Sequence, residues 1–427
     1  MGKTIDSLQQ KYISLDFNYG AHDYHPLPVV LNRGKGVYLW DVDGNKYYDF
    51  LSSYSAVNQG HCHPKIIDEL INQSKTLTLT SRAFHNDKLG DYMKYTTNLF
   101  GFERLLPMNT GAEAVETAIK VSRKWGHTIK NIPKNKAQII VCKNNFHGRT
   151  TSIISFSSDK DSKNYFGPYT PGFIEVEFDD LESLNSQLEK NPNIAGFLVE
   201  PIQGEAGVNV PEINYMSEAK KLCLKHNVLF IADEIQTGIG RTGSLLASCG
   251  NCNCENSCER QKATYTRPDI LILGKALSGG TYPVSAILSD SKIMDVIKPG
   301  QHGSTFGGNP LGCAIAKKAL EVVVDEKLIQ NSKEIGFYFR SEMNKYIKNS
   351  HIVKLIRGKG LLNAIKINDT EQSKTAWEIC LKLLKNGLLA KPTHGNIIRF
   401  SPPLIITLNQ INDCLNIIKK TLQEFEP

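Results

Sequence analysis

Short apolar runs alternate with helical patterns through the middle of this chain, and that alternation restricts the folds it can adopt. The apolar runs have the length of strands and lie at residues 138–142, 196–200, 228–232 and 270–273. The helical pattern before them places its apolar residues on one face, at Ala114, Ala118, Val121 and Trp125. Strands that are apolar on both faces are typical of sheets covered by helices on each side. The pattern therefore predicts an α/β fold with a mainly parallel sheet.

The C-terminal part of the chain has a different pattern. Residues 361–367 and 396–400 are predicted strands, and a helix is predicted between them at 377–384. The last helix is amphipathic, and Thr407 and Gln410 have the spacing of a capping box at its start. Strands and helices in this order favour a small α+β unit.

These patterns divide the chain into three parts. We expect a large domain over residues 49–325 and a smaller α+β domain over residues 326–427. Glycine-containing turn signals at 34–36 and 43–45 predict two hairpins within residues 1–48. This N-terminal segment is expected to pack with the small domain.

The composition excludes several classes of protein. The chain has 427 residues, of which 41% are hydrophobic and 22% are charged, as in an ordinary globular protein. The net charge of +7 is spread along the chain, without the basic clusters of a nucleic-acid-binding protein. No apolar stretch approaches the ~18 residues of a membrane helix, and residues 1–16 lack the pattern of a signal or transit peptide. We therefore expect a cytoplasmic protein that binds neither nucleic acid nor membranes.

Two of the apolar runs are followed by side chains that can take part in catalysis. Asp233 closes the run at 228–232, and Lys275 follows the run at 270–273. A buried lysine can form an imine with pyridoxal 5′-phosphate (PLP), and an aspartate can keep the pyridine nitrogen of PLP protonated. Taken alone, the lysine could equally be a buried ion-pair residue, and the aspartate could cap a helix. Together they predict a PLP site in which the lysine also transfers protons.

A PLP site also needs donors for the phosphate group. Thr110, Gly111 and Ala112 open a helix after a strand, and the free backbone N–H groups of such a helix start can bind phosphate. Many strand-to-helix turns share this pattern, so it is a weak signal by itself. Ser304 and Thr305 lie in a second glycine-rich turn and could donate hydroxyl groups to the phosphate.

The turn at residues 145–149 offers a clamp for the cofactor ring and a cation. Phe146 could stack on the pyridine ring of PLP, although a phenylalanine is as often an ordinary core residue. Arg149 could bind a substrate carboxylate through two parallel hydrogen bonds. This turn therefore adds a ring contact and a carboxylate contact to the predicted site.

These motifs occur together in an order that marks a known family. The chain resembles the class III (subgroup) aminotransferases from about Tyr19 to Phe425, and within them the branch that acts on ornithine. The matching motifs are residues 50–64, 109–114, 200–205, 232–238 and 273–277. The resemblance implies a fold-type I PLP enzyme that works as a homodimer, with its two active sites at the subunit interface.

The resemblance also implies further cofactor contacts. Ile235 and Gln236 would lie against the cofactor, and Gln236 would hydrogen-bond its phenolic oxygen. Thr305 would reach the phosphate of the partner subunit's cofactor. A monomer should therefore be a poor enzyme.

The reaction implied by the resemblance moves the δ-amino group of L-ornithine to 2-oxoglutarate, which yields glutamate 5-semialdehyde and glutamate. Tyr24 and Tyr54 would hold the α-amino end of ornithine, with Arg149 on its carboxylate. Arg399 would bind the carboxylate beside the keto group of 2-oxoglutarate. Glu205 would pair with Arg399 and mask it while ornithine reacts, and would swing away when 2-oxoglutarate binds.

Two features depart from the ornithine branch. His147 stands where those enzymes often have tryptophan, and Phe-His-Gly-Arg is common in the acetylornithine branch. N-acetylornithine and 4-aminobutyrate therefore stay as alternative amino donors, although Tyr24 and Tyr54 suit a free α-amino acid end. Residues 248–266 form an insertion, for which zinc binding, redox chemistry and no special role all stay open. Its cysteines are Cys249, Cys252, Cys254 and Cys258.

Overall fold

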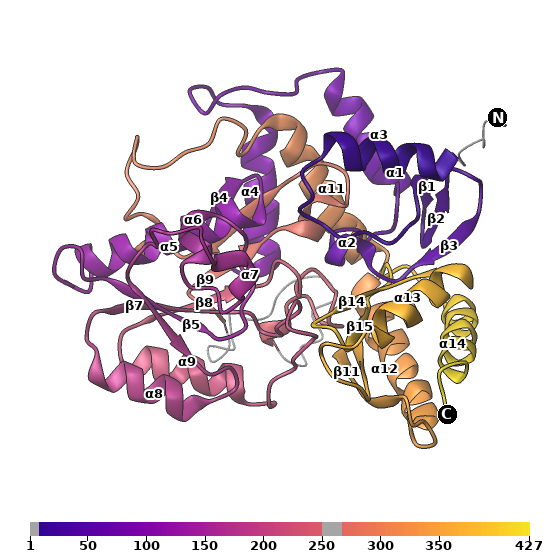
Figure 1. Ribbon diagram of the computed structural model, residues 1–427. Coiled ribbons are helices and arrows are strands. Elements are labelled where there is room, and N and C mark those ends of the chain that lie inside the picture. Colours follow the sequence, from indigo (N-terminus) through magenta and orange to yellow (C-terminus); the bar gives the residue numbers. More distant parts are fainter. Residues whose placement is uncertain (1–7, 250–266) are drawn as a thin grey trace.

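A computed structural model describes residues 8–249 and 267–427, and its largest element is a sheet of seven strands (Figure 1). In spatial order the strands are β4 Arg104–Met108, β10 Ser285–Ser289, β9 Ile270–Leu273, β8 Leu229–Asp233, β7 Ile194–Val199, β5 Gln138–Cys142 and β6 Phe173–Val176. β10 runs antiparallel to both of its neighbours, and the other pairs are parallel. The predicted α/β fold with a mainly parallel sheet is confirmed.

Helices cover both faces of this sheet, which explains why its strands are apolar throughout. Ile139 and Val141 on β5 belong to the same core cluster as Ala118 on helix α5, Gly111–Thr128. The intervening Ile140 belongs to the core on the opposite face, with Leu184 of helix α8. That second face is covered by α8 Leu181–Lys190 and α9 Tyr215–Lys225, and by α4 Asp87–Phe100 and α11 Pro310–Asp325 near β4 and β10.

The C-terminal part forms a second, four-stranded sheet with helices packed against it. The strands lie in the order β11 Val353–Lys359, β12 Leu362–Ile367, β15 Ile397–Phe400 and β14 Lys391–Thr393. The helices are α12 Leu328–Ile347, α13 Thr375–Lys385 and α14 Leu408–Gln423. The predicted capping box at the start of α14 is present between Thr407 and Gln410.

The N-terminal segment contributes helix α1 Leu8–Tyr19 and the hairpin strands β1 Leu31–Lys35, β2 Tyr38–Asp41 and β3 Lys46–Asp49. β3 pairs in parallel with β13, Leu388–Leu389, so this small sheet takes one strand from the C-terminal part. The three domain ranges given above stay predictions, and this pairing supports the expected packing of the N-terminal segment.

The remaining helices are short connections, apart from α3, which packs against α11. They are α2 Ser52–Ser55, α3 Pro64–Ser74, α6 Thr151–Ile154, α7 Lys160–Lys163 and α10 Ser291–Met294. Within the described ranges, no helix is both long and apolar enough to cross a membrane.

The cysteine-rich insertion lies almost entirely outside the described residues, so the predictions made for it stay predictions.

Candidate active site

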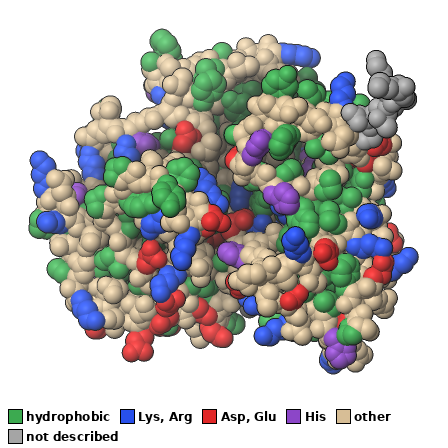
Figure 2. Space-filling model, in the orientation of Figure 1, with side chains coloured by type: hydrophobic (Ala, Val, Ile, Leu, Met, Phe, Trp, Pro, Cys, Tyr) green, Lys and Arg blue, Asp and Glu red, His purple; other side chains and the backbone are tan. Residues whose placement is uncertain are grey.

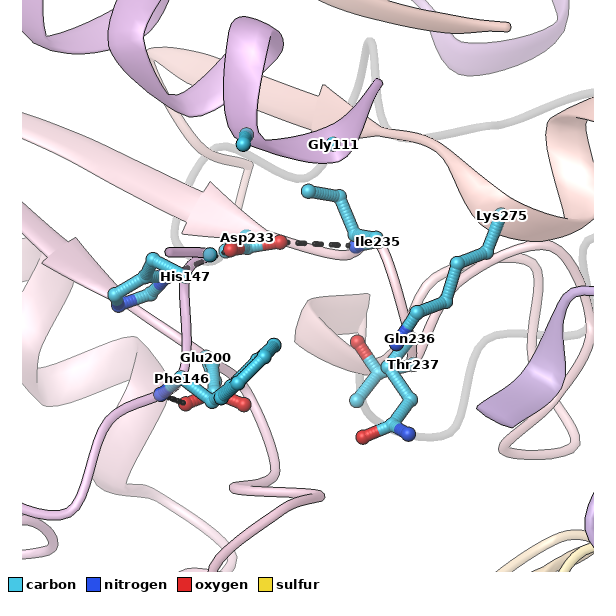
Figure 3. A pocket seen from close by; sticks show the side chains of 11 residues that line it. Gly111, Phe146, His147, Glu200, Asp233, Ile235, Gln236, Thr237 and Lys275 are labelled. Carbon is cyan, nitrogen blue, oxygen red and sulfur yellow. Dashed lines mark hydrogen bonds and ion pairs between the residues drawn. The ribbon is translucent and has the colours of Figure 1, made fainter. Parts of the chain in front are cut away.

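Most of the predicted cofactor residues meet in one pocket at the carboxyl ends of the central strands, whereas Thr110, Ser304 and Thr305 are not part of its lining. Asp233 is the last residue of β8, and Lys275 begins the helical turn η3, Lys275–Ser278, just after β9. Parallel strands bring such ends to one edge of a sheet, where ligands bind in open α/β folds. Figure 3 shows the lining, which is Gly111, Ala112, Phe146, His147, Gly148, Glu200, Asp233, Ile235, Gln236, Thr237 and Lys275.

Lys275 lies in this pocket with a positive φ angle and an amino group of lowered pKa. Its φ angle is +45°, in the left-handed region that costs a residue with a Cβ about 1 kcal/mol. Burial lowers the pKa of its amino group, and the nearby charge of Arg399 lowers this pKa further. A lowered pKa favours the neutral amine, which is the form that can act as nucleophile and proton acceptor.

The carboxylate of Asp233 has two hydrogen-bond partners. Its Oδ1 accepts a hydrogen bond from the Ile235 N–H at 3.0 Å, and its Oδ2 lies 2.6 Å from Nδ1 of His147. Burial by itself lowers the pKa of His147, but the hydrogen bond and charge of Asp233 raise it above its ordinary value. His147 therefore donates to Asp233 and fixes the orientation of this carboxyl group, which would face the pyridine nitrogen of the cofactor.

Glu200 forms a second buried carboxyl group beside this pair. It follows β7, and its Oε1 accepts a hydrogen bond from the Phe146 N–H at 2.9 Å, which fixes the position of the predicted ring clamp. Burial raises the pKa of Glu200 to about 7. The sequence analysis gave no role to His147 or Glu200, because their contacts join strand ends that are far apart in the chain.

The titration of Glu200 predicts a pH dependence of stability. The folded pKa of about 7 lies above the unfolded value of 4.5, so the contribution of Glu200 is fully present below pH 4.5 and is lost as pH rises through 7. We expect Glu200→Gln to remove this loss. The difference in unfolding free energy between variant and wild type should shift in favour of the variant by roughly 1–3 kcal/mol from pH 5 to pH 8.

Urea midpoints of the cofactor-free protein across this pH range measure the effect. Glu182 is exposed on α8, and Glu182→Gln provides the matched control. A wild-type profile that runs parallel to that of Glu200→Gln would contradict the buried titration.

The residues of this pocket fit PLP. Thr110 caps helix α5 by accepting a hydrogen bond from the Glu113 N–H, and Gly111 and Ala112 at the helix start line the pocket, where their N–H groups could bind a phosphate. Phe146 and Ile235 reach the pocket from different loops and could enclose a flat ring (Figure 3). A helix N-terminus for a phosphate, a carboxylate for a pyridine nitrogen and a neutral lysine are the groups that this cofactor requires.

Gln236 extends into the pocket because residue 204 is glycine. A Cβ atom at Gly204 would lie 1.5 Å from Oε1 of Gln236. Ser304 and Thr305 behave differently, since neither lines the pocket. The hydroxyl of Ser304 accepts a hydrogen bond from the Asn109 side chain at 2.8 Å, and Thr305 is exposed.

Two of the predicted substrate residues form an ion pair between a buried arginine and a partly exposed glutamate. Nη1 of Arg399, on β15, lies 2.6 Å from Oε1 of Glu205. Burial raises the pKa of the Glu205 carboxyl group, but the charge of Arg399 outweighs this and lowers it. The Arg399 guanidinium also lies 4.9 Å from the ring centre of Tyr54.

Tyr54 is presented to this pair by a strained turn. All four residues of Ser52–Ser55 have positive φ angles, between +47° and +72°. Such runs are costly for residues with a Cβ, and strain of this kind is concentrated at functional sites. The turn therefore supports a functional role for Tyr54.

Tyr24 and Arg149 line a second hollow, next to the cofactor pocket. The Arg149 guanidinium lies 5.2 Å above the ring of Phe146, and its Nη1 is 3.1 Å from Asp159. Tyr24 is 75% exposed, so it stands at the mouth of the site rather than in it. Figure 2 shows acidic and basic side chains gathered in the central hollow of this face of the molecule.

Comparisons with known proteins match nearly the whole chain. Residues 19–422 match the family model described as aminotransferase class-III. An ornithine aminotransferase of Drosophila ananassae, named as mitochondrial, is 54% identical over 97% of this chain and 92% of its own length. The ornithine aminotransferase of Plasmodium falciparum (isolate 3D7) is 51% identical over 98% of this chain and 97% of its own length.

Two solved structures share the fold over nearly the full length. The ornithine aminotransferase of Toxoplasma gondii ME49 has a TM-score of 0.93 and 45% identity, and the match covers 99% of this chain and 96% of that one. A structure reported as the acetylornithine aminotransferase of Elizabethkingia anophelis has a TM-score of 0.87 and 56% identity, over 98% of this chain and 99% of that one.

Proposed function

Since this chain belongs to the class-III aminotransferase family, we propose that it transfers the δ-amino group of L-ornithine to 2-oxoglutarate. The products are glutamate and glutamate 5-semialdehyde, which cyclises to pyrroline-5-carboxylate. PLP, when bound, withdraws electrons from the reacting carbon and carries the amino group between the two substrates. The Glu205–Arg399 ion pair beside Tyr54 is the observation that carries this assignment.

We assign the chemical roles to the residues of the pocket. Lys275 Nζ holds the cofactor and then accepts the proton that leaves the substrate carbon, which its lowered pKa favours. Asp233 holds the pyridine nitrogen, supported by His147. The start of α5 would hold the phosphate, and the family resemblance implies that Thr305 of the partner subunit would add a hydroxyl group; Thr305 does not line the pocket of its own chain.

The two ends of ornithine pose a problem of discrimination. A free Arg399 would attract the α-carboxylate of ornithine and place the wrong amine at the reacting position. Glu205 neutralises Arg399 in the structure, so the α-carboxylate is left to Arg149 at the mouth of the site. Tyr24 and Tyr54 offer phenol oxygens to the α-ammonium group.

N-acetylornithine is the second candidate donor, because a relative of 56% identity is reported as an acetylornithine aminotransferase. Comparing kcat/KM for ornithine, N-acetylornithine and 4-aminobutyrate, each with 2-oxoglutarate, decides between them. We expect ornithine to lead by at least roughly tenfold, since groups placed for a charged α-ammonium reject an analogue that lacks it. An equal or higher value for N-acetylornithine would reassign the enzyme.

Glu205→Ala should lower the preference for the δ-amino group. With Arg399 unmasked, we expect the share of α-transamination product to rise by roughly tenfold or more, because one charged contact of about 1.4 kcal/mol changes a ratio tenfold. Product analysis by mass spectrometry separates the two regiochemistries. Glu205→Gln, which keeps the shape but not the charge, should give an intermediate ratio, and unchanged regiochemistry in both variants would refute the masking role.

Two further points belong to this proposal. A homodimer would bring Thr305 to the second active site, and sedimentation velocity of the holoenzyme tests that assembly. The cytoplasmic setting stays a prediction, because one relative is named as mitochondrial and another is not; imaging of the full-length tagged protein tests it.

A further inference from the structure

Lys391 lies directly opposite Arg399 in the small sheet. The two residues are register partners on the antiparallel strands β14 and β15. Side chains of directly opposed residues project from the same face, with Cβ atoms about 4.5–5.5 Å apart. Two cationic side chains therefore stand side by side at the substrate end of the active site.

Lys391 is paired with no carboxylate in the part of the chain that the structure describes. It is half-buried. Burial and the charge of Arg399 lower the pKa of Lys391, whereas the charge of Glu205 raises it. The Lys391 Nζ atom also lies 6.0 Å from the ring centre of Tyr24.

Glu205 is fixed beside the same strand by its backbone. The hydroxyl of Thr393 donates a hydrogen bond to the Glu205 carbonyl oxygen at 2.8 Å. Thr393 lies two residues after Lys391 on β14, and alternate residues of a strand face the same side. The carboxylate of Glu205 can therefore change partners by side-chain rotation alone, while its backbone stays beside β14.

Rotation of the Glu205 side chain away from Arg399 costs free energy, because it breaks an ion pair. When a dicarboxylate takes Arg399, the Glu205 carboxylate loses its partner in a place where partial burial already raises its pKa and so disfavours its charged form. A charge that loses its partner in such a place is strongly disfavoured unless another cation receives it. The charge of Lys275 also acts on Glu205, but Lys275 is the residue that would carry the cofactor. Lys391 stands next to Arg399 on the same face of the sheet and can receive the carboxylate.

We propose that Lys391 is the alternate ion-pair partner of Glu205, which receives the carboxylate when a dicarboxylate substrate occupies Arg399. Lys391 is then a positioning residue that determines how easily Arg399 is unmasked. This proposal rests on the masking role of Glu205 in the proposed function. It adds the position that the Glu205 carboxylate takes after it leaves Arg399. Lys391 then sets the balance between the half-reactions of the amino donor and of 2-oxoglutarate.

A double-mutant cycle between Lys391 and Glu205 tests the proposal. The probe is glutarate, a dicarboxylate that cannot react, and its binding to the holoenzyme is measured by titration calorimetry. Lys391→Met should weaken glutarate binding by roughly tenfold, because unmasking Arg399 then leaves Glu205 without a partner. In the Glu205→Ala background the same substitution should change binding by less than about twofold, because no carboxylate has to be relocated.

The alternative is that Lys391 contacts the ligand itself. It predicts an equal loss of affinity in both backgrounds, and that result, like an absence of any loss, would overturn the proposal. Lys391→Arg should restore binding. Lys354 is exposed on β11 at the opposite edge of the same sheet, so Lys354→Met controls for the loss of one positive charge.

The kinetic counterpart is the 2-oxoglutarate half-reaction, followed in single turnovers by the absorbance of the bound cofactor. In Lys391→Met, the apparent affinity for 2-oxoglutarate should fall, whereas that for the amino donor should change less. The reason is that Glu205 stays paired with Arg399 while the amino donor reacts. This reading does not depend on which amino donor is correct. If the donor comparison selects N-acetylornithine, the proposed function fails while the cycle with glutarate still tests Lys391.

Discussion

Replacement of Lys275 by alanine should abolish retention of the cofactor through dialysis and lower kcat/KM by roughly 10⁴-fold. A positioned proton acceptor contributes about 10²–10⁴-fold to rate, and the loss of the covalent attachment adds to that effect. The structure gives the physical reason, since burial and Arg399 lower the pKa of this amine and favour its reactive neutral form. The visible absorption spectrum and steady-state kinetics measure the two consequences separately.

The controls separate chemistry from folding. Lys275 has a φ angle of +45°, which glycine adopts without strain, so Lys275→Gly should be at least as stable as the alanine variant and equally inactive. Lys292 is exposed on α10, away from the cofactor pocket, and Lys292→Ala should retain both colour and rate. An alanine variant at position 275 that keeps its colour after dialysis would contradict the assignment.

The central strands could be predicted because they are continuous apolar runs. Residues 138–142 and 270–273 were expected as strands and form β5 and β9 with those bounds. β10, Ser285–Ser289, was not predicted, since it begins and ends in serine and joins the sheet through pairing with β4 and β9. The two-residue strand β13 has no local signal, because it exists only by pairing with β3, far away in the sequence.

Some residues of the site could also be predicted from local sequence patterns, and others could not. Asp233 and Lys275 were predictable from position, because each closes an apolar strand. The Glu205–Arg399 contact spans 194 residues and was expected only from the family resemblance. The support that His147 gives to Asp233 depends on how two strand ends meet in space, and no local pattern encodes it.

Arg241 also escaped prediction, and its loss should be the most destabilising single change away from the chemistry. The side chain is 0% exposed and lies in the turn after β8. It donates to Asn58 Oδ1 at 2.6 and 3.1 Å, to the Leu361 carbonyl at 3.0 Å and to the Pro402 carbonyl at 2.6 Å. One side chain thus joins the large sheet to the loop before α3 and to the C-terminal part.

Arg241→Met should leave these three acceptors buried without donors. Each orphaned acceptor costs about 1–3 kcal/mol, so we expect the unfolding free energy to fall by at least about 3 kcal/mol. Water has little room to replace the guanidinium, because the backbones are in close contact here: a Cβ atom at Gly360 would lie 2.4 Å from the Gly243 nitrogen. The urea midpoint of the cofactor-free protein measures the loss.

Arg340 provides the matched comparison. It is only partly buried, and its Nη1 serves two acceptors within the C-terminal part, the Gly360 carbonyl at 2.6 Å and the Asn363 side chain at 2.8 Å. Arg340→Met should therefore cost less than Arg241→Met, because fewer acceptors are orphaned and they do not join separate parts of the chain. If the arginine at 241 acts only by filling space, the two methionine variants should unfold at similar urea concentrations, and the role of Arg241 as a hydrogen-bonded joint would be wrong.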